Sequence, residues 1–246
     1  GNRAPNNNSG YTESWNGTAW TELSDANTNR RLTGGVGSGS TDALVFGGDS
    51  NPSPYTANTE SWDGSAWTDV NNLNAAKRFT GGSAGNTTSA LCMGGEENPG
   101  DTANNEFWNG TTWTEVNDLA TAKGYAAGTG TSSSAFSFGG EPGSIATTEE
   151  FTAPADFVQL QQGQLFFNST ANAFKETVID MPGATWASAA ALGTGRYGLG
   201  GFGLKDAAIV FGGSAGSSPY NRDNVEQYNG SSWSEIAEIN QGARNT

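Results

Sequence analysis

Short apolar runs alternate with polar, glycine-rich segments along the whole chain. One apolar run that closes on a glycine pair occurs four times, at residues 43–48, 90–95, 135–140 and 208–213. An apolar run of this length, bounded by turn residues, is typical of a strand that is buried on both faces. The first three glycine pairs lie 47 and 45 residues apart, inside the range of roughly 40 to 50 residues that propeller repeats show.

A second sequence motif recurs between the apolar runs, at residues 12–23, 59–70, 105–116 and 224–236. Its first copy reads Thr-Glu-Ser-Trp-Asn-Gly-Thr-Ala-Trp-Thr-Glu-Leu. The Glu and the first aromatic residue alternate as on a strand, and the second Trp opens another strand. The intervening Asn-Gly or Asp-Gly favours a tight hairpin with a type I′ turn, which needs positive φ at both central positions.

Each repeat therefore predicts four strands: a small glycine-rich strand a, the apolar strand b, the Glu-aromatic strand c and the Trp-led strand d. We expect strand a at residues 32–39, 79–85, 125–130 and 197–203. The fold class is all-β, a propeller of four-stranded antiparallel blades. About five blades are expected, and both ends of the chain align with positions inside a blade.

The fourth repeat has about thirty extra residues. Phe151 aligns with the aromatic residue of strand c and Trp186 with the Trp of strand d, so residues 153–182 replace one c–d turn. Residues 164–178 predict a second hairpin that turns near residues 169–172. We expect one propeller domain, residues 1–246, with residues 153–182 as an inserted subdomain on the face opposite the b–c loops.

The glycine pair, the strand-c aromatic residue and the strand-d Trp resemble the kelch repeat over nearly the whole chain outside the insertion. The amino-acid sequence of the repeats is also similar to that of kelch-like repeats in structural proteins of marine tailed phages, and residues 165–176 resemble a short hairpin of such proteins. This resemblance implies a location on the virion surface, as a fibre, spike or decoration protein. It also implies other virion proteins, or further copies of the chain, as partners.

Composition excludes several classes of function. A formal net charge of −14 argues against nucleic acid as a partner, because few cations are available to contact phosphates. No apolar run approaches the length of a membrane span, so no membrane insertion is expected. The chain has no His and a single Cys92, which argues against a metal site, a cofactor or histidine-dependent catalysis. We expect Cys92 to be a buried small residue on strand b and the protein not to be an enzyme.

One alternative from another class is a glycan-binding or glycan-cleaving, sialidase-like propeller, because residues 61–67 resemble an Asp-box with one residue missing. Sialidase chemistry would need an arginine cluster, and Arg31, Arg78, Arg196 and Arg244 recur near strand a. A residue that recurs in every blade is more simply architectural, and we expect these arginines to pair with the repeated strand-c Glu or with turn carbonyls. A kelch adaptor that binds a protein partner is the other alternative.

Positions that differ between blades are free to carry recognition, and the most variable segments are the b–c loops after each glycine pair. The candidate binding residues there are Asp49, Asn51, Tyr55, Glu96, Glu97, Asp101, Glu141, Tyr220, Arg222 and Asp223. We expect this face to bind a host-surface glycan or protein. The insertion would serve assembly through Phe157, Leu165, Phe166, Phe167 and Phe174.

Overall fold

The computed structural model describes residues 8–50, 53–78, 80, 82–153, 165–168, 173–176, 185–215 and 221–239. These residues form strands, turns and loops, which confirms the predicted all-β class. Within these ranges no helix is long and apolar enough to cross a lipid bilayer.

Four sheets have four antiparallel strands each, hydrogen-bonded in the order a-b-c-d. The strands of the first such blade are β3(Gly34–Gly39), β4(Asp42–Phe46), β5(Thr59–Trp62) and β6(Trp67–Val70). Those of the next blade are β7(Ser83–Asn86), β8(Ser89–Glu97), β9(Gly100–Trp108) and β10(Trp113–Val116). The third contains β11(Ala127–Thr131), β12(Ser134–Phe138), β13(Thr148–Thr152) and β16(Thr185–Ala189). The fourth contains β17(Gly200–Leu204), β18(Ala207–Phe211), β19(Asn224–Tyr228) and β20(Trp233–Glu238).

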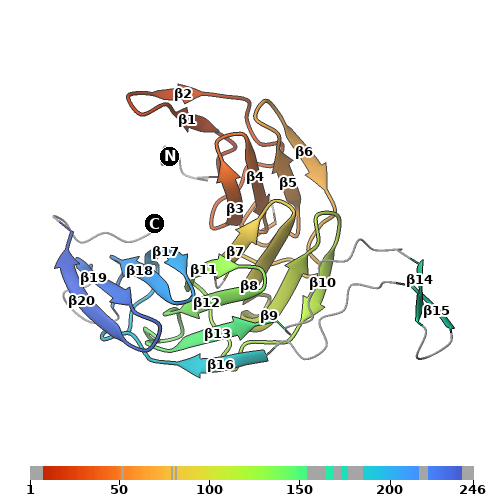
Figure 1. The fold of residues 1–246 in the computed structure, drawn as a ribbon. Helices are drawn as coiled ribbons and strands as arrows, with labels where there is room; N and C mark the ends of the chain where they lie inside the picture. The colour runs from red at the N-terminus through yellow and green to blue at the C-terminus, as the bar shows by residue number, and fades with distance from the viewer. Residues whose placement is uncertain are drawn as a thin grey trace.

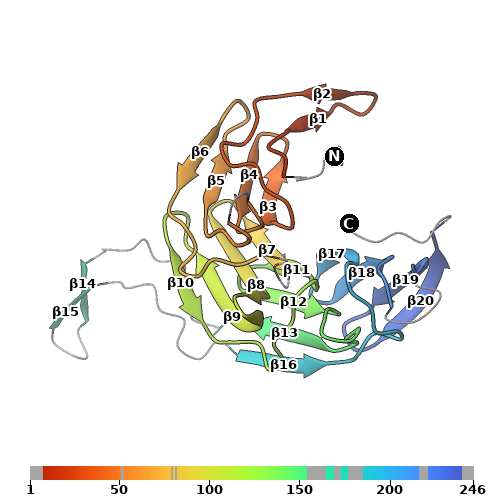
Figure 2. The same cartoon turned by 180° about the vertical axis from the view of Figure 1, so that it is seen from behind.

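A two-stranded sheet precedes these blades. It pairs β1(Glu13–Trp15) with β2(Trp20–Glu22), which occupy the c and d positions of the repeat. The five sheets follow one another around an arc, with the glycine-rich strands β3, β7, β11 and β17 innermost (Figures 1 and 2). The inner strands of successive blades lie against one another. The predicted propeller-like arrangement is thereby confirmed.

Strands c and d pair in the same way in every blade and in the β1–β2 sheet. The two aromatic residues that flank the turn face each other across the strands, as in Trp62 and Trp67, whose ring centroids lie 5.4 Å apart. The turn itself differs from the prediction. Four residues separate the paired Trp residues, only the glycine has positive φ (Gly64, +95°), and the Asp63 carboxylate accepts hydrogen bonds from the next backbone amides at 2.8 and 2.9 Å. An Asx turn in a four-residue loop therefore replaces the predicted type I′ turn.

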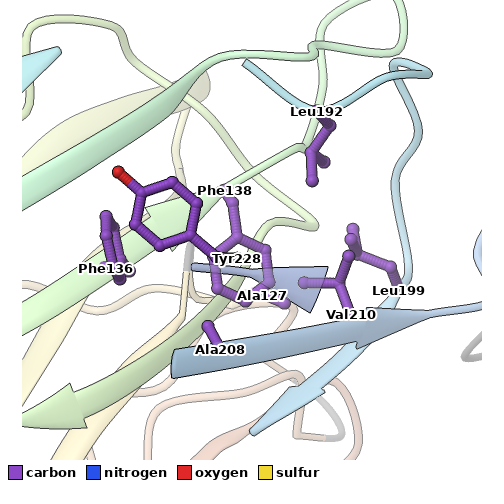
Figure 3. Close-up of a cluster of buried hydrophobic side chains, with 8 residues drawn as sticks. All are labelled: Ala127, Phe136, Phe138, Leu192, Leu199, Ala208, Val210 and Tyr228. Carbon is purple, nitrogen blue, oxygen red and sulfur yellow. The ribbon is translucent and has the colours of Figure 1, made fainter. Parts of the chain in front are cut away.

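Neighbouring blades pack through a repeated apolar interface. Strand b of one blade offers two large side chains, such as Phe136 and Phe138, to the following blade. The following blade packs against them with Ala208 and Val210 of its own strand b, and with Tyr228 and a Trp of its strands c and d. Figure 3 shows Phe136 and Phe138 beside Tyr228 in this cluster. The equivalent cluster one interface earlier in the chain is built on Leu91 and Met93, and the one before that on Leu44 and Phe46.

Each four-stranded blade also contains one buried ion pair. A cation that precedes strand a contacts the repeated Glu of strand c, and every partner side chain is at most 4% exposed. The pairs are Arg30–Glu60, Lys77–Glu106, Lys123–Glu149 and Arg196–Glu226. Pairing with the strand-c Glu was the predicted role, but the repeated position lies one residue earlier than the alignment of Arg31 and Arg78 with Arg196 indicated. The sequence obscures it because two blades have Lys at this position. Arg244 lies outside the described residues.

The glycine pair joins successive blades. The second glycine donates a backbone hydrogen bond to the carbonyl of the next blade's buried cation, as Gly95 does to Lys123 at 2.9 Å. Both glycines of each pair have positive φ, and a Cβ on Gly94 would lie 2.8 Å from the same carbonyl oxygen. Because any side chain would collide with the next blade, glycine is required at this contact.

Two local features depart from the regular repeat. β8 and β9 continue their ladder past the glycine pair to Glu97 and Gly100, so residues 96–104, predicted as a loop, form an extended hairpin. In the next blade β13 pairs directly with β16, from Thr148↔Ala189 to Thr152↔Thr185. Between them β14(Leu165–Asn168) pairs with β15(Ala173–Glu176), with Asn168 opposite Ala173, as the hairpin prediction required. The division into one domain and an inserted subdomain stays a prediction.

Candidate functional site at the channel mouth

The b–c connections and the entries to strand a meet at one end of the inner strands. The residue after each glycine pair forms an antiparallel bridge with the residue that enters strand a of the same blade. These pairs are Arg31 with Asp49, Arg78 with Glu96, Gly124 with Glu141 and Tyr197 with Ser214. The scaffold fixes these backbones, so it also fixes the side chains of Arg31, Asp49, Arg78, Glu96 and Glu141 beside this end of the inner strands, which we call the channel mouth.

A cavity of about 370 Å³ lies between the inner strands. Much of its wall is glycine backbone, from β3, β11 and β17. Leu32, Tyr125 and Leu199 are the larger residues of its lining. Tyr125 also packs edge-on against Tyr197, with ring centroids 6.1 Å apart. The cavity is therefore a largely backbone-lined chamber, and its lining includes one member of this aromatic pair.

A network of two arginines and two carboxylates joins the mouths of the first two four-stranded blades. Arg78 contacts Glu96 through two hydrogen bonds, of 3.1 and 3.2 Å, and reaches Asp49 at 3.4 Å. Asp49 also accepts from Arg31 at 2.8 Å. The Tyr55 hydroxyl donates to Glu96 at 2.8 Å, and Arg78 lies over the Tyr55 ring, 4.9 Å from its centroid. The planar guanidinium thus binds one carboxylate with both arms, which fixes its orientation.

The acidic groups here titrate differently because their surroundings differ. Partial burial alone would raise the pKa of Glu96, but the hydrogen bonds from Arg78 and Tyr55 outweigh it and lower that pKa. Burial, and then the charge of Glu96, raise the pKa of Asp101. Burial followed by the charges of Asp101 and Glu96 raises the pKa of Glu141. These shared causes place Asp101, Glu141 and Glu96 close enough to repel one another.

The pKa of Tyr125 is raised to about 12, first by burial and then by the negative charge of Glu141. The raised pKa keeps the Tyr125 hydroxyl protonated well above neutral pH. The mouth therefore combines fixed cationic donors, a phenol and carboxylate acceptors within one acidic surface.

Five of the ten predicted binding residues gather in this cluster: Asp49, Tyr55, Glu96, Asp101 and Glu141. Glu97 points elsewhere, because successive residues of a strand face opposite sides; it pairs with the buried Lys77 at 3.3 Å. Asn51 and Tyr220 lie outside the described residues.

Arg222 and Asp223 belong to the b–c connection of the last blade. Burial, and to a smaller extent the nearby charge of Arg222, lower the pKa of Arg196, so Arg222 lies near that buried cation. The Asp223 carbonyl accepts from the Ile239 amide at 2.8 Å.

The sequence pattern did not include Arg31, Arg78, Tyr125 and Tyr197 among the candidate binding residues. The first two were interpreted as repeated scaffold residues because the alignment was shifted by one position. The signal that separates them is the buried cation immediately before: Arg30 and Lys77 fill the scaffold role, which leaves the next residue free to vary between blades.

For the insertion, Phe157 lies outside the described residues. The structure gives the backbone pairing of the other assembly residues, with Phe167 opposite Phe174, Phe166 opposite Lys175 and Leu165 opposite Glu176. Cys92 is a fully buried free thiol on β8, and burial raises its pKa to about 12. Across the described ranges, no group of three or more carboxylate or thiol side chains is arranged to hold a metal ion.

The comparisons with known proteins support the fold alone. No protein-family model matches the chain, and no curated protein matches it in sequence. Among solved structures, the one titled "Structure of YjhT" is similar, with a TM-score of 0.68 and 12% sequence identity over 95% of this chain and 79% of that chain. The protein is thus similar in fold, over most of its length, to YjhT.

Proposed function

We propose that the protein is a non-enzymatic binding module of a phage virion surface, and that its channel mouth recognises a glycan on the host surface. The observation that carries this proposal is the contrast between repeated and unrepeated positions. Repeated residues, such as the buried cations and the paired aromatics, build the scaffold. Arg78, Glu96, Tyr125 and Glu141 occupy positions that are not the same residue in all four blades, and they meet at one mouth although they come from two blades.

The chemistry of the mouth suits a sugar. Hydroxyl pairs are bound well by planar groups that offer two parallel acceptors, and the carboxylates of Asp101 and Glu141 are such groups. The aromatic faces of Tyr125 and Tyr197 offer apolar surface to the ring carbons, as aromatic residues do at many interfaces. A rigid mouth above a partly apolar cavity is the common form of a small-ligand site.

The virion setting rests on the resemblance of the repeats to phage structural proteins, with the insertion as the contact to neighbouring virion proteins or to further copies of the chain. The β13–β16 ladder supports this division, because it is continuous without the insertion. Deleting residues 153–182 would leave four residues between Phe151 and Trp186, the same number that separates Trp62 from Trp67. We expect the deletion protein to fold and to lose assembly; assembly that persists would contradict this role.

The glycan proposal is tested by applying the purified chain to a glycan array, together with Glu141→Gln and Tyr125→Ala. Glu115→Gln serves as the matched control, because Glu115 is exposed on β10. We expect a defined set of glycans to bind the wild type and the control, and to bind the two mouth variants at least tenfold more weakly. Equal binding by all four proteins would place recognition elsewhere. Turnover of fluorogenic glycosides by the wild type would overturn the non-enzymatic part of the proposal.

A further inference from the structure

The interface between the β1–β2 sheet and the blade β3–β6 is built only in its outer half among the described residues. The outer half resembles the other blade interfaces. The Trp67 indole donates to the Thr12 hydroxyl at 2.8 Å, as Trp113 does to Thr59 at 3.1 Å one interface later. The backbone amides of Asn27 and Thr28 donate to Glu60 at 2.6 and 3.0 Å.

The inner half is an open groove of about 460 Å³ along β3 and β4. Its lining includes Ala43, Val45 and Trp67. The equivalent residues of the next blade, Ala90, Cys92 and Trp113, are 0, 0 and 5% exposed, because Leu44 and Phe46 of the preceding strand b cover them. The groove thus has the surface that a strand b covers at the other interfaces.

In the part of the chain that the structure describes, the edge of β1 that borders this groove also lacks the strand b that covers it in the other blades. Among the described strands, β1 pairs with β2 alone, whereas every other strand c pairs with a strand b as well. Trp15 and Trp20 remain 48 and 64% exposed, although Trp62 and Trp108 at the position of Trp15 are 4 and 2% exposed. An unpaired strand edge beside an apolar groove is suited to binding an added β-strand.

The position of Glu13 indicates that a segment bound here would also supply a positively charged residue. Glu13 aligns with Glu60, Glu106, Glu149 and Glu226, each of which binds a buried cation that precedes strand a. Glu13 is exposed. A segment that paired with β1 in the register of the other blades would bring its own cation to this carboxylate.

We propose that the edge of β1 and the groove along β3–β4 form a docking site for a two-stranded β-hairpin of the a–b type. The hairpin has an Arg or Lys before a glycine-rich strand, followed by a strand with the pattern Ala-Leu-Val-Phe-Gly-Gly. Its second strand pairs antiparallel with β1, its Leu and Phe cover Ala43, Val45 and Trp67, and its cation binds Glu13. This docking site continues the outer half of the same interface, and it does not depend on the proposed function of the mouth.

The probe is a fluorescein-labelled synthetic peptide of residues 30–49, which contains Arg30, the hairpin of β3 and β4, and the glycine pair. Fluorescence anisotropy would follow its binding to the purified chain. We expect saturable binding by the wild-type peptide, and at least tenfold weaker binding by a Phe46→Ala peptide, because that ring fills the contact with Trp67.

Two changes in the protein locate the site. Glu13→Gln should weaken binding roughly tenfold, the usual size of a hydrogen bond to a charged group, and should leave the affinity of an Arg30→Ala peptide unchanged. Glu22→Gln, on the exposed cross-strand neighbour of Glu13, is the matched control and should bind as the wild type does. Val45→Asp tests the groove without removing the Trp67 hydrogen bond and should also weaken binding.

The absence of saturable binding, equal binding of a scrambled peptide, or identical affinities for Glu13→Gln and Glu22→Gln would overturn the proposal. Sedimentation of the chain alone tests the other occupant. If a concentration-dependent dimer forms and Val45→Asp abolishes it, the groove binds a second copy, and the hairpin proposal is wrong.

Discussion

Breaking one buried ion pair should cost a large part of the stability of the protein, and Arg196–Glu226 is the most informative pair. Their side chains are 0 and 4% exposed and 2.6 Å apart. Glu226 also accepts the Gly193 amide at 2.7 Å. In Glu226→Gln the Arg196 charge stays buried without a counter-ion, which typically costs about 3–5 kcal/mol. Because Arg196 keeps hydrogen bonds to the carbonyls of Gly212 and Asn224, at 3.2 and 2.9 Å, we expect a loss of stability at the lower end of this range.

A loss of about 3 kcal/mol corresponds to a fall of roughly 6–12 °C in the melting temperature of a protein of this size. The measurement is urea and thermal unfolding of the wild type and the variant. The control is Glu150→Gln, whose partner Lys205 lies 3.8 Å away, with side chains 25 and 35% exposed, because pairs near the surface contribute about 0–1 kcal/mol. Replacing both partners, in Arg196→Met with Glu226→Leu, should restore only part of the loss, because the Gly193 amide and the Gly212 and Asn224 carbonyls lose their partners. Equal unfolding free energies for Glu226→Gln and Glu150→Gln would show that the buried pair contributes no more than the partly exposed one.

Three further predictions concern the scaffold and the mouth. Gly94→Ala should lower the unfolding free energy by more than Gly143→Ala. Both glycines have positive φ, which costs a residue with a side chain about 1–2 kcal/mol, but only at Gly94 would the Cβ contact a neighbouring blade, because the space around Gly143 is open. Equal losses in urea unfolding would contradict the blade contact. Cys92 should not react with a disulfide reagent at pH 8 in the folded protein, because with a pKa of about 12 only about one thiol in 10⁴ is ionised, and it should react fully in denaturant; rapid labelling without denaturant would show that β8 is accessible. Asp101→Asn should lower the pKa of Glu141, measured by NMR titration of its carboxyl carbon, because after burial the charge of Asp101 is the main cause that raises this pKa. Both folded pKa values are raised, so these carboxyls bind protons more tightly when folded, and their unfavourable contribution at neutral pH disappears as the pH falls through the raised values toward the unfolded ones; an unchanged Glu141 titration would mean that the two groups are not neighbours.

The fold was predictable because its determinants are local and repeated. Paired glycines, the strand-c Glu and the c–d aromatics occur at a fixed period, and each repeat predicts one blade. The turn type was wrong because Asn-Gly suits two kinds of hairpin. The Asn side chain decides between them by accepting backbone amides, which a sequence pattern does not show.

The site was only half predictable for a different reason. The variable b–c loops indicated the face on which Asp49, Tyr55, Glu96, Asp101 and Glu141 meet. Which of two adjacent carboxylates faces the mouth depends on strand alternation, so Glu96 and Glu97 could not be separated before the β8–β9 ladder was known. Tyr125 and Tyr197 enter from strand a of two different blades, and no spacing in the sequence brings them together.

Glycan binding at the channel mouth is tested by calorimetric titration of the wild-type chain and Tyr125→Ala with the tightest-binding glycan from the array. We expect saturable one-to-one binding by the wild type, at least tenfold weaker binding by Tyr125→Ala, and the same melting temperature for both proteins within a few degrees. Undiminished affinity in Tyr125→Ala, with both proteins folded, would contradict the claim that the channel mouth is the binding site.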